Sequence, residues 1–307
     1  MPQGLVIKST GSWFTVLHEG NTINCRIKGK FRIKGIKTST PVAVGDKVHF
    51  NLVAEDNTGV IHKIEKRHNY IIRKATRFHH EAHLIAANID QAFLMVSLKA
   101  PQTPLEFIDR FLLAAESFFI ETKILINKTD ILDEEEIKSF SAIYNKAGYE
   151  CIPISVKNKI GIESLHERML DKVSLISGNS GVGKSSLIKA INPELDIRID
   201  EISDYHQQGK HTTTFSEIFE VTPKCYIIDT PGIRSFGIID IEKNEVGLYF
   251  KDIFHASSDC KFSNCMHIQE PGCKVRAAVE NGEIAESRYK SYVNIFLDDE
   301  DKHRQGY

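Results

Sequence analysis

Short hydrophobic runs separated by turn residues mark the first part of the chain. Residues 5–8, 13–16 and 47–52 form such runs, and Gly, Asn and Asp residues lie between them. Short strands with these turn signals are typical of a small β-barrel. The pattern therefore predicts an N-terminal barrel of the OB-fold type over residues 1–72.

The hydrophobic pattern changes from about residue 85 to about residue 239. Strand-like apolar runs there alternate with helical patterns, including residues 105–119 and 133–147. Alternating strands and helices predict a parallel α/β sheet with crossover helices. A further helical segment of mixed charge is expected at residues 275–296.

A glycine-rich loop lies between a predicted strand, 173–176, and a predicted helix that starts near residue 185. Its sequence fits the phosphate-loop (P-loop) pattern G-x-x-x-x-G-K-[ST], whose glycines let backbone N–H groups turn toward phosphates. The lysine is expected to contact the β- and γ-phosphates, and the serine after it to bind Mg²⁺. The predicted phosphate-binding residues are Gly178, Asn179, Ser180, Gly181, Val182, Gly183, Lys184, Ser185 and Ser186.

The tetrad Asn127-Lys128-Thr129-Asp130 follows another predicted strand, 123–126. The Asp130 carboxylate can accept hydrogen bonds from the N1–H and the exocyclic amine of guanine, which adenine does not offer in that geometry. The Lys128 stem is expected to pack over the base. GTP is therefore the predicted nucleotide, and a P-loop ATPase or kinase is disfavoured. A weaker candidate for a second base-contacting loop is the short segment that begins with Ser155.

Two segments are expected to respond to the γ-phosphate. Asp229 ends the predicted strand 226–228, so its carboxylate is expected at the sheet edge, where it can hold Mg²⁺ through water. Gly232 has no side chain to obstruct its N–H, which can approach the γ-phosphate. Residues 209–214 are the predicted switch, in which Thr213 completes the Mg²⁺ shell. Its neighbouring threonines, or a plain polar surface loop, are the alternatives.

The catalytic group is harder to assign. Familiar GTPases orient the attacking water with a glutamine, but Ile233 follows the glycine here and cannot hydrogen-bond water, so slow intrinsic hydrolysis is expected. His211 is the predicted group that orients or deprotonates water, with a solvated bystander as the alternative. Lys184 and Thr213 complete the predicted catalytic set. The second functional hypothesis is a GTP-gated RNA-binding scaffold with little turnover.

The order of these motifs along the chain is inverted. An ordinary GTPase domain opens with the phosphate loop and carries the N-K-x-D tetrad near its end, whereas here the tetrad comes first. The chain is therefore predicted to be a circularly permuted GTPase. In this arrangement, the segment after Asp229 leads into the C-terminal residues instead of back into the sheet.

Charge is distributed unevenly along the chain. Residues 1–74 hold thirteen Lys and Arg against five Asp and Glu, while the remainder holds 26 against 36. Cations also alternate with apolar or aromatic residues from Arg26 to Arg32, which suits a nucleic-acid-binding face of the barrel; a solvated basic strand is the alternative. No apolar run is long enough for a transmembrane helix, so a cytoplasmic protein without a membrane partner is expected.

Three of the six cysteines cluster with a histidine. The spacing Cys260-x4-Cys265-x-His267-x5-Cys273 supplies three thiolates and one imidazole, a complete ligand set for one tetrahedral Zn²⁺ ion. Because all four positions would be filled by protein, a structural zinc is predicted. The other cysteines are scattered and are expected to be small buried residues.

The ordered combination of motifs resembles the circularly permuted, ribosome-small-subunit-dependent GTPases of the RsgA (YjeQ) type. The likeness covers nearly the whole chain. Besides the nucleotide and zinc motifs, it rests on Cys25-Arg26 with residues 29–32, Gly45-Asp46, residues 87–91, Asp109-Arg110, Gly209 with residues 211–214, and Glu270-Pro271-Gly272-Cys273.

This resemblance implies an OB-fold at 1–72, a permuted GTPase domain at 73–240 and a zinc-binding helical module at 241–307. It further implies a GTP hydrolase, using Mg²⁺ and one Zn²⁺, that acts late in maturation of the small (30S) ribosomal subunit. The expected partners are that subunit, its rRNA, and GTP or GDP. The protein is expected to act as a monomer.

Overall fold

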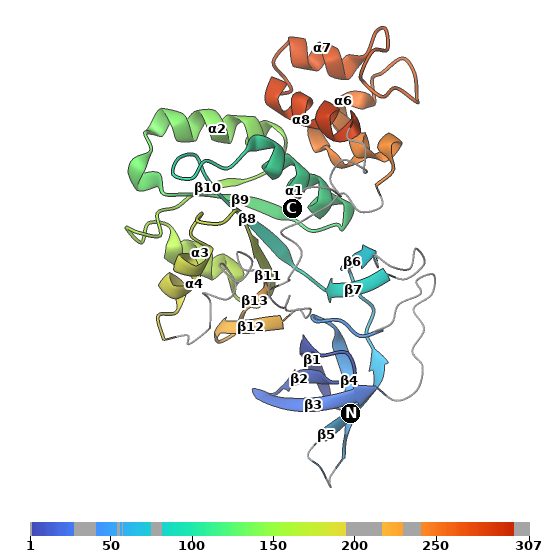
Figure 1. Ribbon diagram of the computed structural model, residues 1–307, viewed down its shortest axis with the longest axis vertical. Helices are drawn as coiled ribbons and strands as arrows, with labels where there is room; N and C mark the ends of the chain where they lie inside the picture. Colours follow the sequence, from blue (N-terminus) through green and yellow to red (C-terminus); the bar gives the residue numbers. More distant parts are fainter. Residues whose placement is uncertain are drawn as a thin grey trace. The chain divides into compact units, whose positions relative to one another are not determined.

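The structure, a computed structural model, describes residues 2–27, 41–53, 56, 58–74, 82–194, 217–229 and 241–297. The chain forms two units, each built from two separate stretches. Residues 1–93 and 161–235 make the first unit, and residues 94–160 and 236–307 make the second. Figure 1 shows the described helices and strands coloured along the sequence.

The first unit begins with a five-stranded barrel. Its strands are β1 (Gln3–Ser9), β2 (Phe14–His18), β3 (Asn21–Ile27), β4 (Lys47–Val53) and β5 (Thr58–Ile64). Strand β1 pairs antiparallel with both β2 and β4, β2 with β3, and β4 with β5, while β3 and β5 are parallel. This pairing closes the sheet and confirms the predicted barrel. Its buried core is formed by Val6, Phe14, Val16, Cys25, Val42, Val48, Phe50 and Ile61.

A tight approach of two backbones fixes the segment before β4. Gly45 has φ 91°, and a Cβ atom there would lie 1.9 Å from the carbonyl oxygen of Ala87, so only glycine fits. The neighbouring Asp46 is fully buried and accepts hydrogen bonds from Arg67 at 2.6 and 2.7 Å. These contacts join the barrel to the following part of the first unit.

The rest of the first unit holds a small sheet and part of the α/β fold. Its elements are β6 (Tyr70–Lys74), β7 (Ala82–Ala87), α3 (Ile162–Met169), β11 (Lys172–Ser177), α4 (Lys184–Ile191), β12 (Glu217–Thr222) and β13 (Cys225–Asp229). Strand β13 runs parallel to β11, as predicted, but antiparallel to β12. The expectation of a parallel sheet was wrong for β12, because only two residues join β12 to β13 and such a connection forms a hairpin.

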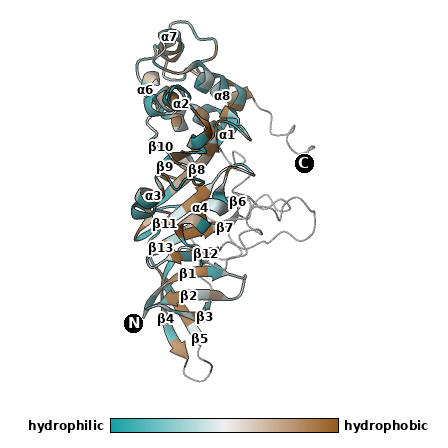
Figure 2. Cartoon of the chain, turned by 90° about the vertical axis from the view of Figure 1, so that its left-hand side faces the viewer, coloured by the Kyte–Doolittle hydropathy of each residue, from teal (hydrophilic) through white to brown (hydrophobic). Residues whose placement is uncertain are grey.

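The second unit contains the other strands of the α/β fold. Strand β8 (Gln91–Ser97) leads into it, and β9 (Thr122–Asn127) and β10 (Cys151–Pro153) are parallel. Helices α1 (Leu105–Ser117) and α2 (Glu134–Lys146) lie where the sequence predicted helices. In Figure 2, β8 is largely brown, or hydrophobic, and α2 is largely teal, or hydrophilic. The strand is buried and the helix is amphipathic, as expected for a covered sheet.

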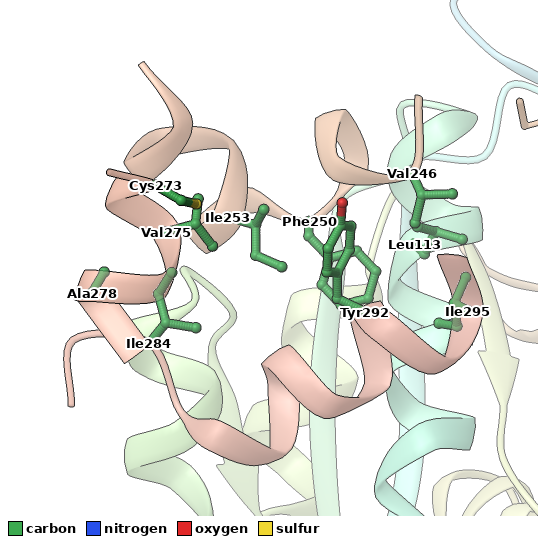
Figure 3. Packing of buried hydrophobic residues seen from close by; sticks show 10 residues of the cluster. All are labelled: Leu113, Val246, Phe250, Ile253, Cys273, Val275, Ala278, Ile284, Tyr292 and Ile295. Carbon is green, nitrogen blue, oxygen red and sulfur yellow. The ribbon is translucent and has the colours of Figure 1, made fainter. Parts of the chain in front are cut away.

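The C-terminal part of the second unit is helical. It consists of η3 (Lys243–Tyr249), α6 (Lys251–Ser257), α7 (Lys274–Glu280) and α8 (Glu286–Leu297). The helix expected at 275–296 is thus two helices, and the left-handed Gly282 (φ 73°) lies in the break between them. Their apolar core includes Leu113 of α1, which lies beside Val246 in Figure 3.

A buried ion network also connects these helices to α1. The Arg288 guanidinium donates to Asp109 of α1 at 2.7 Å and to Asp252 of α6 at 2.7 and 3.0 Å. All three side chains are at most 6% exposed. Because an unpaired buried charge is costly, this network holds α1, α6 and α8 together.

Candidate functional site

The predicted guanine-reading tetrad lies at the end of β9. Asn127 is buried, Lys128 has a left-handed backbone (φ 65°), and the short turn η1 (Thr129–Ile131) carries Asp130. The Thr129 hydroxyl donates to the carbonyl oxygen of Ile154 at 3.0 Å, just after β10. The tetrad is therefore fixed by contacts with the loop that follows the neighbouring strand.

That loop contains Ser155, which the sequence marked only weakly. The Ser155 hydroxyl donates to Asp130 Oδ1 at 2.7 Å and accepts a hydrogen bond from the N–H of Asn158 at 3.2 Å. The N–H of Val156 donates to Asn127 Oδ1 at 3.1 Å. The structure thus brings Ser155 and its neighbours into direct contact with the tetrad.

The electrostatics of this site favour an ionised Asp130. The Ser155 hydrogen bond is the main cause, and the Lys157 ammonium 3.6 Å from Oδ2 adds to it; together they hold the pKa of the Asp130 carboxyl below its usual value. An ionised carboxylate is an acceptor only, so it can receive hydrogen bonds from two N–H groups of one base. Guanine presents such a pair.

The phosphate loop joins β11 to α4 in the first unit. Gly178, Gly181 and Gly183 have φ values of 151°, 74° and 108°, and a side chain at Gly181 or Gly183 would be strained. Lys184 is only 8% exposed, and its ammonium donates to the carbonyl oxygens of Gly178 at 2.6 Å and Asn179 at 2.8 Å. Main-chain carbonyl groups of the loop thereby fix the position of the Lys184 ammonium.

The other predicted phosphate-loop residues follow from this fold. Val182 is buried, Ser185 is half-buried, and Ser180 and Ser186 are exposed. Helix α4 begins at Lys184, so its first N–H groups face the loop and provide the positive end of the helix dipole.

The predicted γ-phosphate-sensing residues are described only in part. Asp229 is the last residue of β13. Its neighbour Ile228 pairs with Leu175 of β11, and β11 ends two residues later, at Ser177. The Asp229 backbone therefore lies near the same strand end as the phosphate loop. His211, Thr213 and Gly232 lie outside the described residues.

The predicted metal ligands come together in the second unit. Cys260, Cys265, His267 and Cys273 place their ligand atoms within 4.8 Å of one another. His267 Nδ1 lies 3.6 Å from Cys260 Sγ and 3.5 Å from Cys273 Sγ. A tetrahedral site with Zn–S bonds of about 2.3 Å has edges of about 3.8 Å, so this donor set fits zinc. Burial also lowers the pKa of His267, which favours the neutral imidazole that binds metals.

Two features shape the loop around this cluster. The Glu270 carboxylate accepts hydrogen bonds from the N–H groups of Met266, Ile268 and Gln269 at 2.7, 2.9 and 3.1 Å. From α8, the Tyr289 hydroxyl donates to the carbonyl of His267, and the Tyr292 hydroxyl donates to that of Met266. The loop is therefore held independently of its four ligand side chains.

The basic face predicted on the barrel is visible at one position. The Arg26 guanidinium lies 3.9 Å from the centre of the Trp13 ring, a cation–π contact that leaves Arg26 exposed. Residues 28–32 lie outside the described part of the chain. Among the described helices, none has the length and apolar character needed to cross a membrane.

Sequence reasoning missed the residues that hold the functional groups in place. Arg288 is far from Asp109 in sequence, and no motif marks it. Ala100, whose carbonyl accepts a hydrogen bond from Lys128 at 2.5 Å, lies in a turn that no motif marks. Only Glu270 had a signal, because it lies within the zinc run.

Comparisons with known proteins agree with this arrangement. The model of the RsgA GTPase family matches residues 64–239, and that of the RsgA N-terminal domain matches residues 3–61. The small ribosomal subunit biogenesis GTPase RsgA of Christiangramia forsetii is 51% identical over 98% of both chains. The protein of the same name from Phocaeicola vulgatus is 50% identical, over 99% of this chain and 100% of the relative.

Two solved structures are also similar. YjeQ from Thermotoga maritima is 38% identical, with a TM-score of 0.77 over 96% of this chain and 97% of that one. YloQ, described as a circularly permuted GTPase, is 31% identical with a TM-score of 0.74, over 100% and 97% of the two chains. Since the GTPase family model covers more than half of the chain and its relatives match nearly all of it, the chain belongs to the RsgA family of circularly permuted GTPases.

Proposed function

We propose that this chain hydrolyses GTP as a factor in late maturation of the small ribosomal subunit, and that the subunit stimulates it. The observation that carries the proposal is the contact between Asp130 and Ser155, which presents an ionised carboxylate suited to guanine in a member of a GTPase family. Two relatives with 51% and 50% sequence identity, over 98% and 100% of their lengths, bear the name of a small ribosomal subunit biogenesis GTPase. We place its action in the cytoplasm, as a monomer.

In this proposal the base is read by side chains of the second unit. Asp130 accepts the N1–H and the exocyclic amine of guanine, and Ser155 keeps the carboxylate in position. Asn127 fixes the second loop through Val156, and the Lys128 stem covers the base. Adenine has an acceptor at N1 and no amine at C2, so Asp130 rejects ATP.

The phosphates are bound by backbone N–H groups of residues 178–186 and by Lys184. Ser185, Asp229 and Thr213 would hold Mg²⁺, which supplies positive charge against the β- and γ-phosphates. Gly232 would register the γ-phosphate through its N–H. His211 is the proposed group that orients or deprotonates water, because Ile233 cannot.

Zinc is the proposed structural metal of the Cys/His cluster. Purified protein should contain one zinc ion per chain, and Cys265→Ser should lower the unfolding temperature of the C-terminal helices while GDP affinity stays near that of the parent chain. Elemental analysis and a GDP titration measure both. Reactive thiols and well below one zinc per chain in protein purified without chelators would reject this assignment.

The barrel is the proposed rRNA-binding surface. Its excess of basic residues gives salt-dependent attraction to phosphates, and Arg26 stacked on Trp13 offers both a charge and an aromatic surface. We propose that the zinc-binding module contacts the subunit as well, so that the GTP state and the GDP state bind it with different affinities.

Steady-state turnover tests the proposal. Purified small subunits should accelerate GTP hydrolysis, large subunits should not, and excess ATP should not compete. Small subunits should also co-sediment more of the protein with a non-hydrolysable GTP analogue than with GDP. Turnover that small subunits leave unchanged would reject the enzymatic proposal and favour the GTP-gated scaffold, for which Ile233 in place of glutamine is the supporting observation.

A further inference from the structure

The lysine of the guanine tetrad is held by a turn that no motif marks. Lys128 Nζ donates to the carbonyl oxygen of Ala100 at 2.5 Å. Ala100 lies between β8 and α1, and its backbone is left-handed (φ 48°), a conformation that costs free energy for a residue other than glycine. The carbonyl group of a residue with a strained backbone thus holds the side chain of Lys128, which we assign to the nucleotide site.

The turn is closed by a reciprocal pair of hydrogen bonds. The N–H of Thr103 donates to the carbonyl oxygen of Ser97 at 2.8 Å, and the N–H of Ser97 donates to Thr103 Oγ1 at 3.0 Å. Ser97 is 0% and Thr103 4% exposed. Hydrogen bonds between two buried residues therefore fix the two ends of the turn. One of these bonds depends on the Thr103 hydroxyl.

A second contact fixes the turn from the side of α2. Lys99 Nζ lies 2.6 Å from Glu136 Oε2, and Glu136 also accepts the N–H of Asp133 in the capping box that starts α2. This ion pair is half-exposed, so it contributes less than the buried bonds of Thr103. Within the turn the Ser97 hydroxyl also donates to the carbonyl oxygen of Lys99, so Ser97 and Thr103 together fix the position of the Ala100 carbonyl.

We propose that Thr103 is a positioning residue for guanine binding, and that it acts through Lys128. Thr103 fixes the turn 97–103, the Ala100 carbonyl holds the Lys128 ammonium, and the aliphatic stem of Lys128 is thereby ordered before the base arrives. Ordering a lysine side chain in advance removes part of the entropy loss from the binding step. The inference rests on the proposed guanine site.

The test is a double-mutant cycle with GDP affinity as the readout. Thr103→Val removes the hydroxyl that accepts from Ser97 and keeps the shape of the side chain, and Lys128→Met removes the ammonium and keeps a stem. Each single variant should bind a fluorescent GDP analogue about tenfold more weakly, the loss expected for one hydrogen bond to a charged group. The double variant should bind about as weakly as Lys128→Met alone.

Matched controls separate positioning from general stability. Thr122 is also 4% exposed and its hydroxyl also makes one hydrogen bond, to the carbonyl of Ile120 at 3.2 Å. Thr122→Val should leave GDP affinity unchanged, whereas Thr103→Ser, which keeps the hydroxyl, should bind GDP like the parent chain.

The outcomes distinguish the possible failures. Losses that multiply in the double variant would show that Thr103 does not act through Lys128, and equal effects of Thr103→Val and Thr122→Val would assign Thr103 to stability alone; either result overturns the inference. A parent chain that does not bind GDP would instead reject the proposed function itself.

Discussion

The guanine-reading loops and the phosphate loop hold their key groups by different means. Asp130 is positioned by side chains, with the Ser155 hydroxyl at 2.7 Å and the Lys157 ammonium at 3.6 Å. Lys184 is positioned by main-chain groups, the carbonyl oxygens of Gly178 and Asn179 at 2.6 and 2.8 Å. The first arrangement depends on which residues are present, and the second depends on the path of the backbone.

Base selectivity and phosphate binding are therefore encoded in different features of the chain. Base selectivity should respond to single substitutions around Asp130, because each removes a hydrogen-bond partner. Phosphate binding should tolerate changes of most loop side chains, provided that the glycines and Lys184 remain.

Within the phosphate loop, the largest effect is expected when its lysine is removed. Lys184→Met should lower GTP turnover by about 10²- to 10³-fold, the loss typical when a donor to developing charge is deleted. Single-turnover hydrolysis measures it, and the thermal unfolding temperature is the control for folding. Turnover equal to that of the parent chain would remove Lys184 from the catalytic set.

Breaking the support of Asp130 should have a smaller, selective effect. Ser155→Ala should weaken GDP binding by about tenfold, because Asp130 loses its oriented donor and the N–H of Asn158 loses its acceptor. The matched control is Ser117→Ala on α1, whose hydroxyl donates to the carbonyl of Ala114 in the same helix. If both variants bind GDP equally well, Ser155 does not position the guanine-binding carboxylate.

The same substitution should change the pH dependence of binding. Only ionised Asp130 accepts both guanine donors, and the Ser155 hydrogen bond keeps the pKa of this carboxyl low. Affinity is therefore retained above that pKa and lost as pH falls through it. In Ser155→Ala the pKa of Asp130 rises toward its usual value, so the loss begins at higher pH. GDP titrations at decreasing pH measure this shift. Curves of affinity against pH that coincide for the parent chain and Ser155→Ala would contradict it.

The smallest effect is expected within the phosphate loop. Asn179 contacts Lys184 through its main-chain carbonyl, so Asn179→Ala should change GTP affinity by no more than about threefold, the usual range for a substitution that removes no key contact. Isothermal titration with GTP and GDP measures this. A loss as large as that of Ser155→Ala would remove the contrast between the two regions.

The sequence predicted the parts of the site that are local in the chain. The strands β9, β11 and β13, and the motif residues that follow β9 and β11, were predicted because hydrophobic runs and short motifs lie next to each other. The cluster of three cysteines and one histidine was predicted for the same reason, since its members lie within fourteen residues of the chain.

Long-range contacts could not be predicted in this way. Asp130 and Ser155 are 25 residues apart, Lys128 and Ala100 are 28 apart, and Arg288 and Asp109 are 179 apart, so only the folded chain brings them together. The break at Gly282 was missed because a periodic pattern continues across it, and the hairpin of β12 and β13 was missed because hydrophobic runs do not show strand direction.

We propose above that Asp130 reads the base in an enzyme that small ribosomal subunits stimulate. The most direct measurement is hydrolysis of GTP and of xanthosine triphosphate (XTP) by Asp130→Asn, each with and without purified small subunits. An amide at this position mismatches guanine and matches xanthine, so GTP affinity should fall by roughly 10²- to 10⁴-fold while XTP is hydrolysed and its turnover rises with added subunits. Unchanged GTP hydrolysis by this variant, with no gain for XTP, would contradict the account.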